Sequence, residues 1–235
     1  MRRLRRKRAA PGSGVKKYFE YRGVSHAVYA PIIQDDASNF VTGDVKDFTG
    51  VSEIGKSTES SSEIHHYDNV SAIIVDAIGT DTVSISASGI PLEVLADING
   101  QYYDKETGLF VEWEGRSPFY AFGYITERTD GTQMYVWRLK GKFSVPDLAS
   151  VSKDSGSAAN GQSVTFKGVS TIYRFKTTGK PTKGLIVDAS IADVSEEMFF
   201  RKVQTPDSKE SVIIDSEGCA IIDDEGNELI AMERW

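Results

Sequence analysis

The chain has 235 residues, of which 40% are hydrophobic and 26% are charged. This composition is typical of a soluble globular protein with one ordinary domain and appendages, or with two small domains. No stretch approaches the roughly 20 consecutive apolar residues of a membrane-spanning helix, so we expect no membrane partner. The single cysteine, Cys219, excludes an internal disulfide and a cysteine-based zinc site, and it fits a chain that folds in a reducing cytoplasm.

Charge is distributed unevenly along the chain. The whole chain carries −7 at neutral pH and residues 1–17 carry +8, so residues 18–235 carry −15. An acidic body argues against a protein that binds nucleic acid, because such binding depends on contacts of Lys and Arg with phosphates. No apolar segment follows the basic residues, which excludes a secretory signal. We predict that residues 1–16 form a basic, disordered leader, and we favour a solvated tail over an arm for an anionic partner.

The body begins with strand patterns. Residues 18–22 and 27–30 combine aromatic and β-branched residues with polar ones between them, which is typical of strands. Residues 44–69 show no sustained helical period and are rich in Ser, Glu and Gly. We predict a long polar loop here that contacts another subunit, since a loop of this length in a compact domain is usually functional or disordered. In residues 82–88, apolar residues alternate with serines, which predicts a half-buried strand.

One short helix is predicted directly after that strand. Pro91 favours a helix start and Gly100 favours its end, so the helix covers residues 91–99. Helical spacing predicts a stripe of residues that packs on the body. The residues of this stripe are Leu92, Leu95, Ala96 and Asn99.

After the helix, the sequence predicts mostly strands. Residues 110–113 form one strand, and residues 119–125 and 134–139 form a hairpin around a turn at residues 129–131. The first strand of the hairpin is apolar on both faces, which predicts burial on both sides. The domain core would cover one side, and a helix or another subunit would cover the other. The two faces consist of Tyr120, Phe122 and Tyr124, and of Phe119, Ala121 and Ile125.

The last third of the chain contains further short strands. Residues 150–161 are a Ser/Gly-rich loop, and residues 184–187 are a strand. Between them, strand alternation slips by one residue at Gly168, which predicts a β-bulge. An acidic, glycine-containing segment at residues 213–218 recurs at residues 221–226. We predict a β-meander there, within a C-terminal extension over residues 201–235 that follows a body domain of residues 17–200.

No catalytic, cofactor or metal site is predicted. His65 and His66 are adjacent, and adjacent residues of a strand point to opposite faces, so a structural or surface role is favoured over metal binding. The acidic turns at residues 215–217 and 223–225 lack the spacing of a calcium loop. Tyr18, Phe19, Tyr21 and Tyr29 suit packing in a core or interface better than a stacking platform for a sugar or single-stranded nucleic acid.

Sequence motifs of enzymes are equally scarce. The chain has no glycine-rich phosphate loop, no nucleophile elbow and no pairing of Cys with His. Asp and Glu are plentiful, so a catalytic carboxylate pair stays open, but nothing in the sequence selects any two of them. We predict that the protein is not an enzyme and holds no cofactor.

The order of the segments resembles that of a known family. An early strand pair ends in Tyr29-Ala30-Pro31-Ile32, and the polar loop contains Glu63-Ile64-His65-His66-Tyr67-Asp68-Asn69. The alternating strand runs into Gly89-Ile90-Pro91-Leu92-Glu93, the hairpin begins at Pro118 and ends in Phe143-Ser144-Val145-Pro146, and Val164-Thr165-Phe166 precedes an aromatic strand. Over about residues 17–200 this order is similar to that of the major tail proteins, or tail-tube proteins, of siphophages.

The resemblance implies a β-sandwich or barrel-like fold flanked by one helix. It further implies that subunits form hexameric rings, which stack into a tube with an inner barrel of strands. Tape-measure protein would fill the lumen during assembly in the host cytoplasm, and phage DNA would pass through it later. The other partners implied are the tail terminator and baseplate proteins of the virion.

Two other functions stay open at this stage. A β-sandwich module that binds carbohydrate or a receptor would share the strand pattern. A hydrolase with a carboxylate pair is the third hypothesis and the one with least support. An acidic body fits the tube best, because a like-charged wall repels phosphate and lets DNA slide without sticking.

Overall fold

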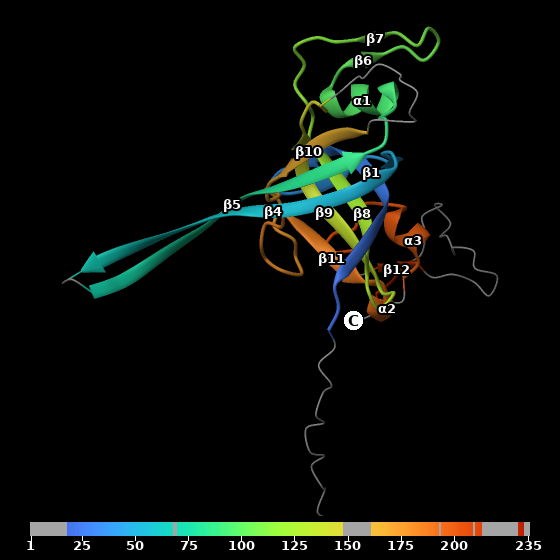
Figure 1. Ribbon diagram of the computed structural model, residues 1–235. Coiled ribbons are helices and arrows are strands. Elements are labelled where there is room, and N and C mark those ends of the chain that lie inside the picture. The colour runs from blue at the N-terminus through green and yellow to red at the C-terminus, as the bar shows by residue number, and fades with distance from the viewer. Residues whose placement is uncertain are drawn as a thin grey trace, which may run out of the picture.

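The computed structural model describes residues 18–67, 70–147, 161–192, 194–208, 210–212 and 230–232. Within these residues the fold is mainly antiparallel β-structure with three short helices, as Figure 1 shows. The predicted mainly β fold is therefore confirmed. The leader at residues 1–16, nearly all of the loop predicted at residues 150–161 and both copies of the acidic repeat lie outside the described residues.

The strands and helices have the following bounds in chain order. They are β1 (Tyr21–Asp35), β2 (Phe40–Thr42), β3 (Lys46–Asp47), β4 (Val51–Tyr67), β5 (Val70–Ala87), α1 (Leu92–Asn99), β6 (Tyr102–Tyr103), β7 (Phe110–Val111), β8 (Tyr120–Arg128), β9 (Gln133–Phe143), β10 (Gln162–Gly168), β11 (Gly184–Asp188), α2 (Ala189–Ala192), α3 (Glu196–Phe200), β12 (Glu210–Val212) and β13 (Ile230–Met232). β6 pairs with β7 and β12 pairs with β13, and the other strands belong to one sheet.

That sheet is curled. Its strands follow the order β2-β1-β8-β9-β10-β5-β4, with β3 also paired to β1 and β11 also paired to β9. The two ends of the sheet approach each other, because β4 at one end contacts β1, which lies next to the other end. The architecture is thus barrel-like, with one continuous sheet in place of the two facing sheets of a sandwich.

One face of the sheet encloses an aromatic core. Tyr120, Phe122 and Tyr124 of β8 belong to it, as the alternation in β8 predicts. The rings of Phe48 and Phe143 stack with their centroids 5.5 Å apart. The buried residues of this first core are Ala27, Tyr29, Phe48, Val83, Ile85, Ala87, Ile90, Val94, Ile98, Tyr120, Phe122, Tyr124, Val136, Phe143, Val164 and Phe166.

The opposite face of the sheet is buried as well, which confirms the prediction of burial on both sides. Trp137 is fully buried there, and its ring centroid lies 5.5 Å from that of Phe200 on α3. The cover therefore comes from a helix of the same chain. The buried residues of this second core are Val28, Ala30, Ala121, Ile125, Tyr135, Trp137, Leu139, Phe175, Phe199, Phe200 and Val203.

Phe119 differs from the prediction for that face. It precedes β8 and is part-exposed, and the ammonium groups of Lys140 and Lys142 lie 4.9 and 4.6 Å from its ring centroid. The slip at Gly168 also has a different cause from the predicted bulge. β10 ends at Gly168, and the chain then crosses the sheet, so that Phe166 belongs to the first core and Phe175 to the second.

The predicted helix is confirmed as α1, and Gly100 ends it with a left-handed φ of 65°. The predicted stripe is correct for Ala96 and Asn99, which are buried, and for Leu95, which packs against the first core, but it is wrong for Leu92. Leu92 is 44% exposed and Leu95 is half-buried. The side chains that enter the first core from α1 are those of Val94 and Ile98.

Hydrogen bonds to Asp97 explain this orientation of α1, in which Val94 and Ile98 face the core and Leu92 faces solvent. The hydroxyl of Tyr29 donates to Oδ2 of Asp97 at 3.0 Å, and the hydroxyl of Tyr120 donates to the Asp97 carbonyl oxygen at 2.6 Å. Burial, together with the nearby charge of Asp97, raises the pKa of Tyr120 to about 12, so this hydroxyl stays protonated as a donor. Both tyrosines belong to the first core and hold Asp97 toward the sheet.

The largest difference from the prediction concerns residues 44–69. This segment is not a loop, because β3 and β4 occupy it, and β4 pairs with β5 over its whole length. Strand pairing depends on backbone hydrogen bonds, so a Ser- and Glu-rich strand forms readily opposite the more apolar β5. The polar composition of β4 reflects exposure and not a lack of secondary structure.

We predict that Ile98→Ala lowers the free energy of unfolding by about 2–4 kcal/mol, because Ile98 is fully buried in the first core. Leu92→Ala is the matched control and should change it by less than about 0.5 kcal/mol. Urea unfolding followed by circular dichroism measures both. Equal losses in the two variants would contradict the observed orientation of α1.

Candidate assembly surface

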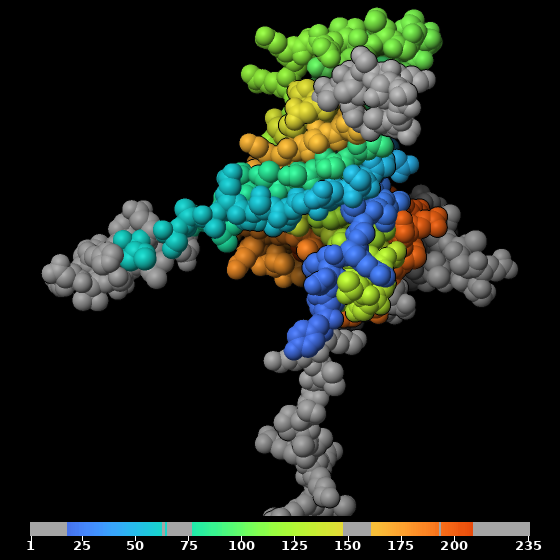
Figure 2. All heavy atoms as spheres, in the orientation of Figure 1, coloured from blue at the N-terminus to red at the C-terminus, as the bar shows by residue number. Residues whose placement is uncertain are grey.

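β4 and β5 continue beyond the body as a two-stranded arm, which Figure 1 shows projecting to one side. We define the arm as residues 60–67 of β4 and 70–78 of β5. Its ladder runs from Ser60 opposite Ile78 to Tyr67 opposite Val70. At the usual rise per residue the arm is about 25 Å long. In Figure 2 the described part of the arm forms a narrow neck that leaves the body.

Both outer edges of the arm are unpaired within the described part of the chain. β10 pairs with β5 only between Asp81 and Ala87, and β4 pairs with β5 alone. A two-stranded hairpin by itself is marginally stable in water. Its free N–H and C=O groups form a template on which another strand can pair. The arm therefore has the geometry of a surface that gains stability from a second chain.

The arm also presents apolar side chains to solvent. Ile64 is 51% exposed and Ile78 is 74% exposed. Ile78 lies opposite Ser60, which is four residues from Ile64 along β4, so the strand register places both isoleucines on one face. In sequence, residues 70–78 are apolar except for Ser71 and Asp76. An exposed apolar face of this kind is typical of an interface with another protein.

The root of the arm is held by a buried carboxylate, Asp81, at the point where β5 separates from β10. Thr58 Oγ1 donates to Asp81 Oδ1 at 2.9 Å, and Lys183 Nζ donates to it at 3.2 Å. Lys56 Nζ and Arg138 Nη1 lie 3.5 and 3.6 Å from Oδ2. We name these five residues the root cluster. They connect β4, β5 and β9 with the residue that precedes β11.

The root cluster stabilises the ionised form of Asp81. Burial alone would raise the pKa of this carboxyl. Hydrogen bonds from Thr58 and Lys183 and the charge of Lys56 outweigh burial, so the pKa lies below its usual value. Sequence reasoning missed this residue, although a signal exists: Asp81 continues the inward-facing alternation of Val83 and Ile85, where a charge requires partners.

The histidines lie in two places. His65 and His66 are neighbours on β4 within the arm, opposite Ile73 and Ser71. His26 interrupts β1 with a positive φ of 50°, and its Nδ1 lies 2.9 Å from Glu196 Oε1 on α3. His26 therefore links β1 to the helix that covers the second core, which is a structural role.

The aromatic run near the start of β1 is divided between core and surface. Tyr29 is buried in the first core, whereas Tyr18 and Tyr21 are exposed. The guanidinium of Arg128 lies 4.3 Å from the ring centroid of Phe19. The four aromatic residues do not form one stacking platform.

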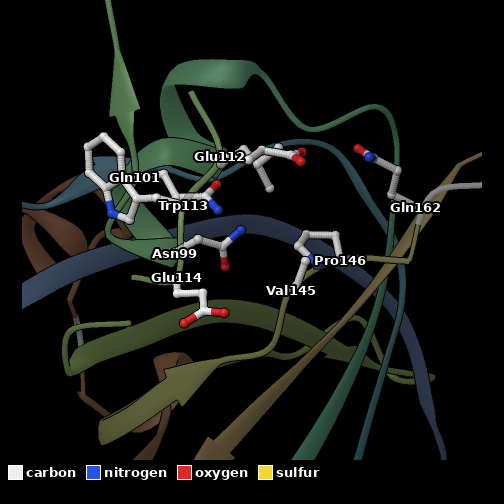
Figure 3. A pocket seen from close by; sticks show the side chains of 9 residues that line it. Asn99, Gln101, Glu112, Trp113, Glu114, Val145, Pro146 and Gln162 are labelled. Atoms are coloured by element: carbon white, nitrogen blue, oxygen red, sulfur yellow. The ribbon is translucent and has the colours of Figure 1, made fainter. Parts of the chain in front are cut away.

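A shallow hollow of about 410 Å³, lined by both polar and apolar side chains, lies beside α1 (Figure 3). Two of its lining residues are acidic and none is basic. Sequence reasoning missed this hollow, because its residues come from four separate segments. They are Leu95, Asn99, Gln101, Glu112, Trp113, Glu114, Val145, Pro146 and Gln162.

Within the described ranges, no group of three or more His, Cys, Asp or Glu residues is arranged to hold a metal ion. In the same ranges no helix is long and apolar enough to cross a bilayer, and the longest, α1, has eight residues. The acidic turns at residues 215–217 and 223–225 and Cys219 lie outside the described part. Comparison with protein-family models and with curated proteins gave no match.

We predict that Asp81→Asn lowers the free energy of unfolding by about 3 kcal/mol at pH 7, because it leaves buried cations without their carboxylate. The pKa of Asp81 is lowered in the folded state, so its contribution is complete above the unfolded-state pKa of about 4 and is lost as pH falls through the folded-state value. The difference in free energy of unfolding between the parent and the variant should therefore become smaller at acidic pH. Denaturant unfolding between pH 3 and 7 measures it.

Asp47→Asn serves as the control, because Asp47 is exposed. It should show no such pH-dependent difference. If the difference in free energy of unfolding between the parent and Asp81→Asn stays constant down to pH 3, the root cluster does not stabilise the ionised form of Asp81.

Proposed function

We propose that this chain is the structural subunit of a siphophage tail tube, which assembles into stacked hexameric rings that conduct DNA during ejection. The proposal assigns the chain to the virion and gives it no catalytic role. The observation that carries it is the arm, whose outer edges are unpaired among the described residues and which exposes Ile64 and Ile78 on one face. A subunit of a polymer needs such a surface, whereas a monomeric protein has to protect it.

The closed body supports the same proposal. Both faces of the curled sheet are already buried by residues of the chain itself. Contacts with other copies are therefore left to the arm, the sheet edges and the two ends of the body. Head-to-tail contacts between different surfaces generate rings or open filaments, and a tube of stacked rings requires both.

The charge of the body fits a conduit for DNA. Residues 18–235 carry −15 per copy, so a ring of six copies would be strongly acidic. A like-charged wall repels phosphates, while each wall Lys or Arg would form a contact that slows sliding. Under this proposal the lumen holds tape-measure protein first and DNA later, and the tube ends bind the tail terminator and baseplate proteins.

A module that binds carbohydrate or a receptor is the alternative. The observation in its favour is the hollow that Trp113 helps to line, because sugar sites commonly combine an aromatic ring with amide and carboxylate groups. Such a module has no need for a two-stranded arm with unpaired edges. The tube therefore accounts for more of the structure.

We predict that a shortened arm abolishes assembly and leaves the body folded. Residues 61–77 are replaced by Asn-Gly, a dipeptide that closes a two-residue hairpin between Ser60 and Ile78. The root cluster remains complete in this variant. Electron microscopy of the parent should show tubes or six-fold rings, and the variant should stay monomeric in analytical ultracentrifugation with an unchanged circular dichroism spectrum. Normal tubes from the variant would contradict the proposal.

A point variant tests the same surface with less disturbance. Ile78→Glu places a charge on the exposed face of the arm and should reduce assembly about tenfold or more, since burial of an unpaired charge in an interface is costly. Ile191→Glu on α2 is the matched control, because Ile191 is 79% exposed and lies outside the arm. It should assemble as the parent does.

The electrostatic part of the proposal makes a separate prediction. In a cryo-EM structure of the assembled tube, acidic residues should line the bore and basic ones should be sparse there. The leader, with its Arg-rich residues 2–8, should lie outside the bore or be absent from mature tubes. A net positive inner wall, or an ordered leader in the lumen, would refute the electrostatic argument even if tubes form.

A further inference from the structure

We infer that the root cluster is a binding site for a free phosphate-type oxyanion, a tetrahedral anion that carries two negative charges. The inference goes beyond the proposed function and does not depend on it, because a single folded copy would already hold the site. The root cluster was described above as the anchor of the arm, and its charges and its unused hydrogen-bond donors exceed what that role needs.

The charges of the root cluster are not balanced. Lys56, Arg138 and Lys183 lie within 4 Å of the same carboxylate, that of Asp81, so the net charge is +2. Within the described residues, none of the three cations pairs with any other acid. The side chain of Glu59 packs against Gly79, but it forms no ion pair with the cluster. Like charges held this close repel one another and favour an additional anion.

The two lysines of the cluster keep unused donors. Lys183 Nζ donates twice, to Asp81 Oδ1 and to the carbonyl oxygen of Gly79. Lys56 Nζ donates once, to Thr58 Oγ1 at 2.7 Å. An ammonium group has three N–H donors, so each lysine can donate to a further acceptor.

Arg138 provides a second, independent indication. Its side chain is only 9% exposed, yet none of its five N–H donors forms a hydrogen bond with a described residue. A buried charged group without hydrogen bonds is costly, and an acceptor would recover part of that cost. Nε is enclosed, whereas Nη1 and Nη2 keep contact with solvent. Gly184 lies opposite Arg138 on β11, and a Cβ there would lie 3.2 Å from Nη1, so no side chain at this position covers the guanidinium.

The cluster lies where the sheet opens. β10 pairs with β5 as far as Gly168 opposite Asp81, and β5 then continues into the arm that leaves the body in Figure 1. The side chains of Lys56 and Lys183 are 32% and 21% exposed. A small anion can therefore reach the cluster from solvent, and it would connect β4, β9 and the residue before β11.

Phosphate matches these groups better than other anions do. A guanidinium pairs with two oxygens of one phosphate in a fork geometry, and lysines bind phosphate as point charges. A dianion also neutralises the net charge of +2, whereas a single carboxylate would leave one positive charge. The phosphates of duplex DNA carry one charge each on a broad surface, which suits exposed lysines better than the recessed guanidinium of Arg138.

The test is isothermal titration calorimetry of the full chain with inorganic phosphate, in a phosphate-free buffer held at an ionic strength of about 0.15 M with sodium chloride. Phosphate should bind saturably with a Kd of about 1 mM or below, and sulfate should compete with it. Lys56→Gln and Lys183→Gln should each weaken binding about tenfold, because a charge-assisted hydrogen bond is lost. Each variant leaves two cations around Asp81, so the fold should be retained, which circular dichroism checks.

Lys142→Gln is the matched control. It also removes one positive charge from β4–β9 of the body, but Lys142 lies over the ring of Phe119 and outside the cluster, so the affinity should change less than about twofold. Equal weakening by this control and by the cluster variants would overturn the inference. Absence of saturable phosphate binding to the parent would overturn it as well.

Two further measurements complete the test. If a cluster variant fails to fold, phosphorus NMR of the parent decides: a phosphate signal that broadens with protein and sharpens again with sulfate supports the site, and a signal that sulfate does not change refutes it. Duplex DNA of about 20 base pairs is titrated under the same conditions. Binding of DNA that depends on Lys56 and Lys183, without binding of free phosphate, would overturn the inference.

Discussion

The carboxylate of Asp81 is the constraint on which the shape of the molecule depends. β5 belongs to the sheet up to this residue and to the arm beyond it. Lys56, Arg138 and Lys183 surround one buried anion, so the cluster has an excess of positive charge and requires Asp81 to stay ionised. Lys183 also donates to the carbonyl oxygen of Gly79, the residue between the root and the arm. The arm thus leaves the body in a direction set by side chains of three other segments.

A second constraint comes from the two-sided burial of the sheet. β8 and β9 contribute alternate residues to both cores, with Phe122 in the first and Trp137 in the second. The described body contains its own cover, since α3 packs on the second core and Val203, just beyond the helix, is buried there too. Asp207 then accepts hydrogen bonds from the N–H groups of Lys176 and Thr177, so the packed body reaches past residue 200. Under the proposed function, the surfaces left for partners are the edges and ends of this described body.

Sequence patterns identified the elements that obey a simple period. The alternation of Val83, Ile85 and Ala87, the hairpin turn before β9 and the glycine that ends α1 all have local causes, and the structure agrees with each. The Ser-rich strand β4 was missed because its pairing depends on β5, which no local pattern in β4 encodes. α3 was missed because it is short, although Ser195 caps it by accepting from the N–H of Met198.

The candidate surfaces were harder to predict for a related reason. The root cluster and the hollow each combine residues far apart in sequence, and only the curled sheet brings them together. The rotation of α1 depends in the same way on Tyr29 and Tyr120, which hold Asp97 from distant strands. Composition and periodicity carry no information about such contacts. The unpaired polar group of Asn99 becomes visible only once burial is known.

The composition of the arm has a consequence for the free subunit. Residues 70–78 combine β-branched residues with a single charge, Asp76, and the outer edge of their strand is unpaired in the part of the chain that the structure describes. Segments of this kind are the ones that nucleate irregular, amyloid-like aggregation when they stay exposed. The charged and Ser-rich β4 protects only one side of the strand. If the chain assembles as proposed, ordered polymerisation and aggregation compete for the same edge, and the concentration of unassembled subunits has to stay low until growing polymer ends remove them.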